Sequence, residues 1–314
     1  MTIKLSTDTV LSPIEERVAR RGGGHLSRRR LYTRRFLRNR AAVAGLVILA
    51  LLVVFAIAGP VLTPYTYTDV DFTNLTSAPS STHWFGTNGP GNDTFAQTAH
   101  GLARSLVIGV VVSLLTTLIA AFVGATAAYL GGTAQMAILG IVHFLLVVPS
   151  FLILALISQK AGGDWKVLIL VLTAVGWMYG ARVVWSLSTS LREREYIQAA
   201  RFMGVSSLRI VLRHLIPNIG SLLIITFTLG VVATVQAETG LSFIGFGVKQ
   251  PDVSLGSMLG DGANTITSAP WLFYFPAVML TLLTVSMALI GDGLRDALDP
   301  TSHSAGHVRR AGRA

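Results

Sequence analysis

The residues of this chain that could support catalysis are few, and their spacing argues against a reaction. The densest glycine cluster, Gly86 to Asp93, reads Gly-Thr-Asn-Gly-Pro-Gly-Asn-Asp and resembles a loop that cradles a phosphate. A nucleotide-binding P-loop also needs Gly-Lys-Ser/Thr, and no lysine in the chain follows a glycine. The sequence has no cysteine, which excludes thiolate nucleophiles, thiolate metal sites and disulfides. We therefore predict no catalytic residue, no metal site and no cofactor bound by this chain.

Polar residues within the long apolar stretches are equally sparse. They are His143 and Gln236, with Arg182 and Glu238 near the ends of two stretches. A lone histidine in an apolar helix is usually a packing residue, and an arginine near a helix end can extend to the membrane interface. We expect neither Arg182 nor Glu238 to form a buried charge relay.

Two other classes of membrane protein fit this inventory poorly. An ion-driven secondary transporter needs ionisable groups near midspan and inverted repeats with broken helices, and only His143 lies near midspan. A membrane-embedded hydrolase needs paired aspartates, a His-Glu metal motif or a Gly-x-Ser-x-Gly elbow within the spans, and none occurs.

The residues most typical of a binding surface lie at 189–216, between the fourth and fifth apolar stretches. Helix-forming residues run to Gly204, which can take the left-handed conformation, and Ser206 can then cap a second short helix. Pro217 suits the first turn of the next membrane helix. The side chains that we expect to be exposed among the charges are those of Tyr196, Ala199, Ala200 and Phe202. Small, aromatic and basic residues together indicate a surface for a protein partner.

Six apolar stretches must position these residues, and each has about the length that a helix needs to cross a bilayer. They run at 41–62, 105–130, 136–158, 167–188, 217–237 and 271–291. The sequence, 52% apolar and 13% charged, leaves no room for an additional soluble domain of ordinary size. We predict an all-α, polytopic membrane protein with six transmembrane helices.

Basic residues predict the orientation of these helices. Of 25 Lys and Arg, eleven precede the first span, five lie at 189–216 and four follow the last span. Six spans place these segments on one side, and the positive-inside rule makes that side the cytoplasm. Both termini are therefore expected in the cytoplasm.

The arginine-rich N-terminal tail has two further interpretations. In a soluble protein it would suggest nucleic acid, but a basic run ending at a membrane helix more simply contacts anionic lipid headgroups. The sequence from Thr33 to Arg38 also resembles a twin-arginine export signal, with a small-residue cleavage site at Ala56-Ile57-Ala58. Five further spans favour a retained helix, so we expect lipid contact and no nucleic acid.

The pattern divides the chain into five parts. We predict a basic tail at 1–40, a first transmembrane helix at 41–62, an external segment at 63–104, a five-helix core at 105–292 and a tail at 293–314. The core includes the loop at 189–216 and an external loop at 238–270. Glycines alternate with apolar residues from Gly240 to Gly247, which predicts a helix break and a re-entrant or surface-lying element.

The loop at 189–216 resembles that of the inner-membrane permease subunits of ABC importers. The family motif is Glu-Ala-Ala, three residues, Gly, nine residues, Ile, one residue, Leu-Pro. The corresponding positions here are Gln198, Ala199, Ala200, Gly204, His214, Ile216 and Pro217. The acidic residue is replaced by Gln198, which removes any ion pair that the family makes there.

Nearly the whole chain resembles the second permease of the dipeptide, oligopeptide and nickel subfamily, of the oligopeptide or dipeptide permease protein C type. The most specific segments are Ala237 to Gly247 and Gly291 to Pro300. Other matching segments are Arg34 to Arg40, Phe85 to Asp93, Tyr129 to Gly132 and Pro149 to Leu152. Departures are Asn88 and Asn92, usually Asp and Arg, and His143, often Asp; these bear on local ion pairs and not on the family.

The resemblance implies a type I ABC importer permease fold and a non-catalytic subunit in a bacterial inner membrane. It implies a heterodimer with a homologous permease, two ATPase domains that use ATP and Mg²⁺, and an extracytoplasmic substrate-binding protein. Peptide is the substrate class expected, with nickel or another small solute as the alternative. The loop residues expected to couple to the ATPase are Glu195, Tyr196, Gln198, Ala199, Ala200, Gly204 and Pro217.

The external loop then has two interpretations. Its position at the outer end of the fifth span suggests an external gate or a docking surface for the binding protein. The residues assigned to this role are Glu238, Gly240, Phe243, Gly245 and Gly247. A packing hairpin without a docking role is the other interpretation.

Overall fold

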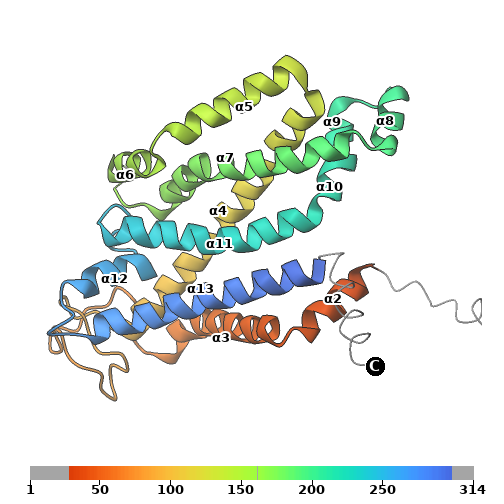
Figure 1. Cartoon of the computed structure of the whole chain (residues 1–314). Coiled ribbons are helices and arrows are strands. Elements are labelled where there is room, and N and C mark those ends of the chain that lie inside the picture. Colours follow the sequence, from red (N-terminus) through yellow and green to blue (C-terminus); the bar gives the residue numbers. More distant parts are fainter. Residues whose placement is uncertain (1–27, 161, 299–314) are drawn as a thin grey trace, which may run out of the picture.

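The computed structural model describes residues 28–160 and 162–298, which form helices and loops without a β-strand (Figure 1). The long helices are α3 (Arg40–Leu62), α4 (Thr94–Leu130), α7 (Trp165–Arg192), α11 (Gly220–Phe243) and α13 (Trp271–Leu298). The shorter ones are α2 (Arg28–Arg38), α5 (Gly132–Val147), α6 (Ser150–Lys160), α8 (Glu195–Phe202), α9 (Ser207–Ile210), the π-helix η1 (Val211–Leu215), α10 (Ile216–Asn218) and α12 (Leu255–Ala263). Five helices are long and apolar enough to cross a membrane, or six with the bent pair α5–α6 as one span. The all-α membrane fold is confirmed.

The third apolar stretch is not one straight helix. α5 and α6 meet at an angle of 74° across Val148 and Pro149. Proline lacks the N–H that a helix needs and restricts the residue before it to extended conformations, and Val148 has ψ 128°. The expected span at 136–158 is therefore divided between two helices of different direction.

α4 begins eleven residues earlier than the span expected at 105–130. Asp93 caps it by accepting a hydrogen bond from Ala96 N at 2.8 Å, so the helix includes residues 94–104 of the expected external segment. At 37 residues the helix is about 55 Å long, well beyond the ~30 Å of a hydrocarbon core. α4 thus extends through the bilayer and into the polar region at its outer end.

Glycines let the long helices pack closely. A side chain at Gly45 of α3 would come within 2.7 Å of Ser286 O in α13, and one at Gly109 of α4 within 2.8 Å of Val235 in α11. One at Gly124 of α4 would collide with the backbone of α7 at Ala181. In a membrane, where apolar burial gives no preference for helix over lipid, close packing through small residues drives helix association.

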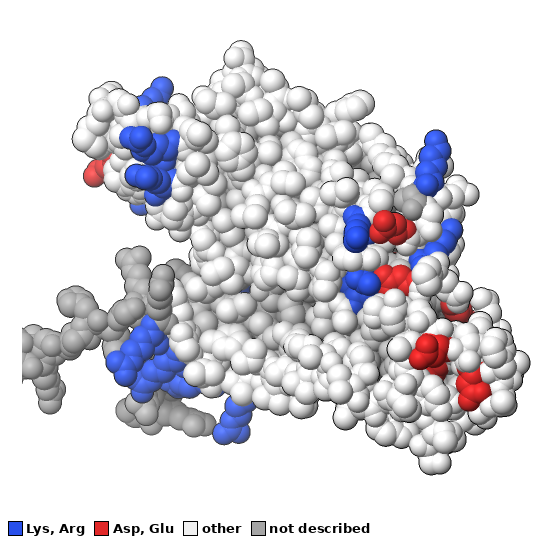
Figure 2. Space-filling model, turned by 180° about the vertical axis from the view of Figure 1, so that it is seen from behind, with Lys and Arg blue, Asp and Glu red and all other residues white. Residues whose placement is uncertain are grey.

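The two ends of the bundle differ in charge. α8, α9 and α2 lie at one end, and residues 63–93 and α12 lie at the other (Figure 1). Figure 2 shows Lys and Arg clustered at the first end, most of the visible acidic residues together with several Lys and Arg at the second, and an uncharged band between the two ends. We call these the inner and the outer end, after the predicted orientation. Tail residues 1–27 and 299–314 lie outside the described residues, and α13 extends to Leu298, into the expected C-terminal tail.

Candidate functional site

The loop between α7 and α11 is firmly attached to the bundle. Its buried side chains pack with Ala125 of α4 and Val184 of α7, and they are Ile197, Ala200, Ile210, Val211, Leu215 and Ile219. Arg192 at the end of α7 donates a hydrogen bond from Nη1 to the carbonyl of Ala128 in α4, at 3.0 Å. A displacement of this loop therefore acts directly on α4 and α7.

The loop presents an apolar tip. Phe202 and Met203 are 87% and 75% exposed, and Tyr196 is 44% exposed. They precede Gly204, whose φ of +76° is the left-handed conformation predicted for it. Large apolar side chains exposed beside arginines are typical of a surface that another protein covers. Sequence reasoning did not single out Met203, although it adjoins the turn glycine.

Three details of this loop differ from expectation. Ala200 is buried, because the face of α8 that carries it packs on α4 and α7. Ser206 occupies the N-cap position of α9, but its side chain makes no capping hydrogen bond. Pro217 lies in the short helix α10, which Ile219 separates from α11, so it does not begin the membrane helix. The π-helix η1 precedes this break and had no recognised sequence signal.

The remaining predicted loop residues surround the tip. Glu195 and Ala199 are exposed, and Gln198 is partly buried. Gln198 Nε2 donates to Glu193 Oε2 at 3.4 Å, a bond between a neutral amide and a carboxylate where the family has an acidic residue. Gln198 thus makes a polar contact with Glu193, which also forms an ion pair with Arg192 at 2.8 Å.

At the outer end, Glu238 connects three helices instead of forming a surface. It is fully buried in α11, and its Oε1 accepts hydrogen bonds from Ser242 Oγ and Ser254 Oγ, each at 2.6 Å. Ser254 caps α12, and Leu255 N beside it donates to Ser105 Oγ of α4 at 3.2 Å. Glu238 therefore fixes the start of α12 against α11 and α4.

The predicted helix break in this region occurs later than expected. α11 continues past Gly240 to Phe243, and the chain turns at Gly245, where φ is +83°. Gly240, Phe243 and Gly245 are exposed, whereas Gly247 is buried against Ser242. Any direct contact with a docking partner is left to the three exposed residues, because Glu238 and Gly247 are covered by the chain itself.

Residues 63–93 form a compact unit held by polar contacts. His83 is buried, with Nδ1 2.9 Å from Asp93 Oδ1 and Nε2 3.3 Å from Asp71 Oδ2. Asn88 and Asn92, which replace a charged pair of the family, hydrogen-bond to each other at 3.1 Å. These two neutral side chains thus contact each other directly.

A second polar cluster attaches the outer loop to α4. Asp252 lies 2.7 Å from His100 Nε2 and 2.7 Å from Arg104 Nη2. The Arg104 guanidinium also lies over the ring of Trp165 at the start of α7, 4.0 Å from its centroid. Tyr67 stacks on His100 with ring centroids 3.7 Å apart. Sequence analysis missed this cluster, because its members are up to 185 residues apart in the chain, from Tyr67 to Asp252.

The isolated polar residues of the spans lie on the surface of the chain. His143 is exposed on α5, so the expected packing role is wrong for this chain by itself. Gln236 of α11 and Arg182 of α7 are also exposed, and Arg182 borders an open groove with Tyr179 and Leu222. Within the described residues no group of three or more His, Asp or Glu could hold a metal ion.

Comparison with known proteins identifies this architecture. Residues 116–303, which include the loop and α11 to α13, match the model of the binding-protein-dependent transport system inner membrane component. Residues 27–79 match the N-terminal transmembrane domain of oligopeptide transport permease C. The chain belongs to the family of binding-protein-dependent transport system inner membrane components. It is accordingly a multi-pass membrane protein of the ABC importer type.

Curated relatives of this permease cover nearly its full length. The oligopeptide transport system permease protein OppC of Mycobacterium tuberculosis (strain H37Rv) is 51% identical over 280 residues, which is 88% of this chain and 96% of the relative. The OppC of Escherichia coli K12 is 37% identical over 85% of this chain and 89% of its own length. The dipeptide transport system permease protein DppC of Bacillus subtilis is 37% identical over 85% of this chain and 84% of its own length.

Proposed function

We propose that this chain is one half of the translocation pathway of an ATP-driven peptide importer in a bacterial inner membrane. It pairs with a second, homologous permease, receives peptide from an extracytoplasmic binding protein, and couples to two ATPase domains. The chain is not itself catalytic; ATP and Mg²⁺ belong to the ATPase subunits. Both termini are cytoplasmic. The names of the full-length relatives, OppC and DppC, support peptide as the substrate class.

The observation that carries this proposal is the form of the loop at 189–216. Its tip is exposed and apolar, while its base packs on α4 and α7. An ATPase domain that binds Phe202 and Met203 would move the loop with the helices attached to it. Rigid-body movement of this kind is a common way of transmitting a nucleotide-driven change.

The peptide itself requires no selective charged pocket in this chain. Peptides of varied sequence share only their backbone and their termini, so backbone, small and polar groups suffice along the pathway. We therefore assign the choice of substrate chiefly to the binding protein and assign no substrate site here.

Substitutions at Gly204 test the coupling role. Proline cannot adopt φ +76°, so we expect Gly204→Pro to abolish peptide import and co-purification of the ATPase. Asparagine tolerates the left-handed region, so Gly204→Asn should retain both. No atom lies within 4 Å of a side chain added here, so bulk alone does not separate the two variants.

A change outside the backbone turn completes this test. We expect Phe202→Ser to weaken binding of the ATPase about 30-fold, since loss of a central aromatic anchor costs about 2 kcal/mol or more. Met136→Ser removes another exposed side chain outside the loop and should change nothing.

Normal assembly and import by Gly204→Pro would show that the loop does not couple to the ATPase.

A further inference from the structure

One carboxylate at the outer end has no partner among the described residues. The others there are occupied: Asp71 and Asp93 by His83, Asp252 by His100 and Arg104, Asp69 by Thr66 N, Asp164 by Lys166 N, and Glu238 by two serines. Asp261 of α12 makes no hydrogen bond or ion pair within the described chain. Asp261 is exposed at the rim of a cavity, so its charge is available to a group from outside this chain.

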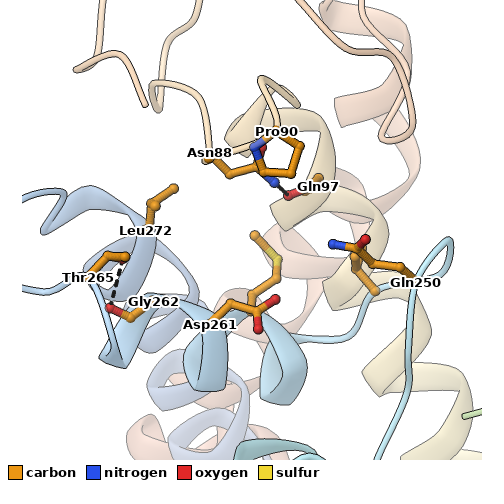
Figure 3. A pocket seen from close by; sticks show the side chains of 11 residues that line it. Asn88, Pro90, Gln97, Gln250, Asp261, Gly262, Thr265 and Leu272 are labelled. Atoms are coloured by element: carbon orange, nitrogen blue, oxygen red, sulfur yellow. Dashed lines mark hydrogen bonds between the residues drawn. The ribbon is translucent and has the colours of Figure 1, made fainter. Parts of the chain in front are cut away.

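Asp261 borders a cavity of about 250 Å³ (Figure 3). The cavity lies between the loop at Asn88, the first turn of α4 at Gln97, the outer loop at Gln250, and α12. Asn88 Nδ2 donates to Gln97 Oε1 at 3.1 Å, so these two amides are already paired. Figure 3 shows the side chains of Asp261 and Gln250 bordering the same open space.

The chemistry of this lining favours a cationic group. Neighbouring groups partly desolvate the exposed Asp261 carboxyl and so raise its pKa, and no described side chain or backbone group pairs with its negative charge. The side-chain carbonyl of Gln250 accepts no hydrogen bond within the described chain. It can therefore accept a hydrogen bond from the same cationic group that pairs with Asp261. Met258 and Leu272 provide apolar surface for a methylene stem. Together these groups match an ammonium or guanidinium at the end of an aliphatic chain.

The size and position of the cavity limit its occupant. Its volume is below the ~300–1,000 Å³ of pockets for drug-sized ligands, so it fits one side chain and not a peptide of several residues. It lies at the outer end, at the opposite end of the molecule from α8 (Figure 1). Its base is α12, whose capping Ser254 is hydrogen-bonded to Glu238 in α11. A group bound in the cavity is thus connected through two contacts to a membrane helix.

We propose that this cavity receives a lysine or arginine side chain of the extracytoplasmic binding protein, with Asp261 as its counterion and Gln250 as a second acceptor. This proposal rests on the proposed function, because it requires a binding protein to dock at the outer end. It places docking on α12 and Gln250, together with the exposed Gly245 after α11. The insertion of a basic side chain would press on α12 and, through Glu238, on α11.

Neutralising Asp261 tests this proposal in the assembled importer. We expect Asp261→Asn, in lipid nanodiscs with both ATPase domains, to raise about tenfold the concentration of loaded binding protein that gives half-maximal stimulation of ATP hydrolysis. The wild-type value should rise with NaCl concentration, because salt screens the charge pair, and this dependence should weaken in the variant. Asp261→Glu retains the charge and should remain within about threefold of wild type.

Asp164→Asn is the matched control. It removes another outer carboxylate that does not line the cavity, and asparagine caps a helix as well as aspartate does. If Asp261→Asn and Asp164→Asn respond to binding protein and to salt as wild type does, the cavity does not hold a basic side chain. If the wild-type complex itself shows no stimulation by a loaded binding protein, the proposed function fails, and the cavity proposal fails with it.

Discussion

The contacts of His83 show how single residues hold the outer end together. His83 contacts a carboxylate with each ring nitrogen, Asp93 through Nδ1 and Asp71 through Nε2. Asp93 also caps α4. The unit at 63–93 is therefore attached to α4 through the contact between His83 and Asp93, and a substitution that removes either carboxylate weakens the contacts of His83.

Acid should loosen this unit. Hydrogen bonds from Thr73 and Asn74 lower the pKa of Asp71 below its ordinary value of 3.8. Because the folded form has the lower pKa, the stabilisation is present above pH ~4 and is lost as the pH falls below it, where the unfolded segment binds more protons. We expect amide hydrogen exchange in residues 66–93 to accelerate as the pH decreases from 5 to 3, beyond the intrinsic pH dependence of exchange.

Asp71→Asn provides the control for this effect. The variant should exchange faster than wild type at pH 6 and should show less additional acceleration on acidification. Identical corrected profiles for the two proteins would show that Asp71 does not hold the segment. The sequence did not predict this arrangement, because Asp71, His83 and Asp93 are separated by ten residues or more in a stretch without helical or strand periodicity.

At the scale of helices, hydropathy predicted the apolar helices but not where each begins and ends. Residues 94–104 include Gln97, His100 and Arg104 and lack an apolar run, so α4 appeared to begin later. The cap at Asp93 was the available signal. α12 was not predicted, and its three glycines, Gly256, Gly260 and Gly262, are unfavourable in the interior of a helix. Close packing explains them: side chains there would strike Thr239, Phe243 and Leu272.

The turn after α11 gives a prediction at this scale. Gly245 is exposed and no atom lies within 4 Å of a Cβ added there, so we expect Gly245→Trp to leave assembly intact despite its backbone strain. If this turn docks the binding protein or gates the pathway, the variant loses stimulation of ATP hydrolysis by loaded binding protein. ATPase assays on purified complexes measure this, with size-exclusion chromatography to verify assembly.

Two further variants separate strain from contact in that experiment. Gly245→Asn should preserve the left-handed turn and the stimulation. Gly240→Trp adds the same bulk on the exposed face of α11 without backbone strain, so it measures the effect of bulk alone on the stimulation. Loss of assembly in Gly245→Trp would favour the packing hairpin, and full stimulation in an intact complex would count against the docking role.

For the whole molecule, the arrangement of basic residues predicts which end faces the cytoplasm. Reporters fused after Thr76 or Asp252 should be external, and a reporter after Ser206 should be cytoplasmic. The same is expected after Gly306, which lies outside the described residues. Alkaline phosphatase and green fluorescent protein fusions distinguish these locations. An external signal at Ser206 would contradict the six-span topology.

The continuity of α4 has a consequence for the register between the two ends of the molecule. α4 is one uninterrupted helix. Its Ala128 carbonyl accepts a hydrogen bond from Arg192 in the loop at 189–216, and its Arg104 forms an ion pair with Asp252 in the outer loop. Each residue of an α-helix advances the azimuth by 100°. A single residue inserted between Arg104 and Ala128 would rotate one of the two contacts about the helix axis relative to the other. Seven inserted residues would nearly restore their original relative direction. The length of this helix can therefore vary only in near-integral turns.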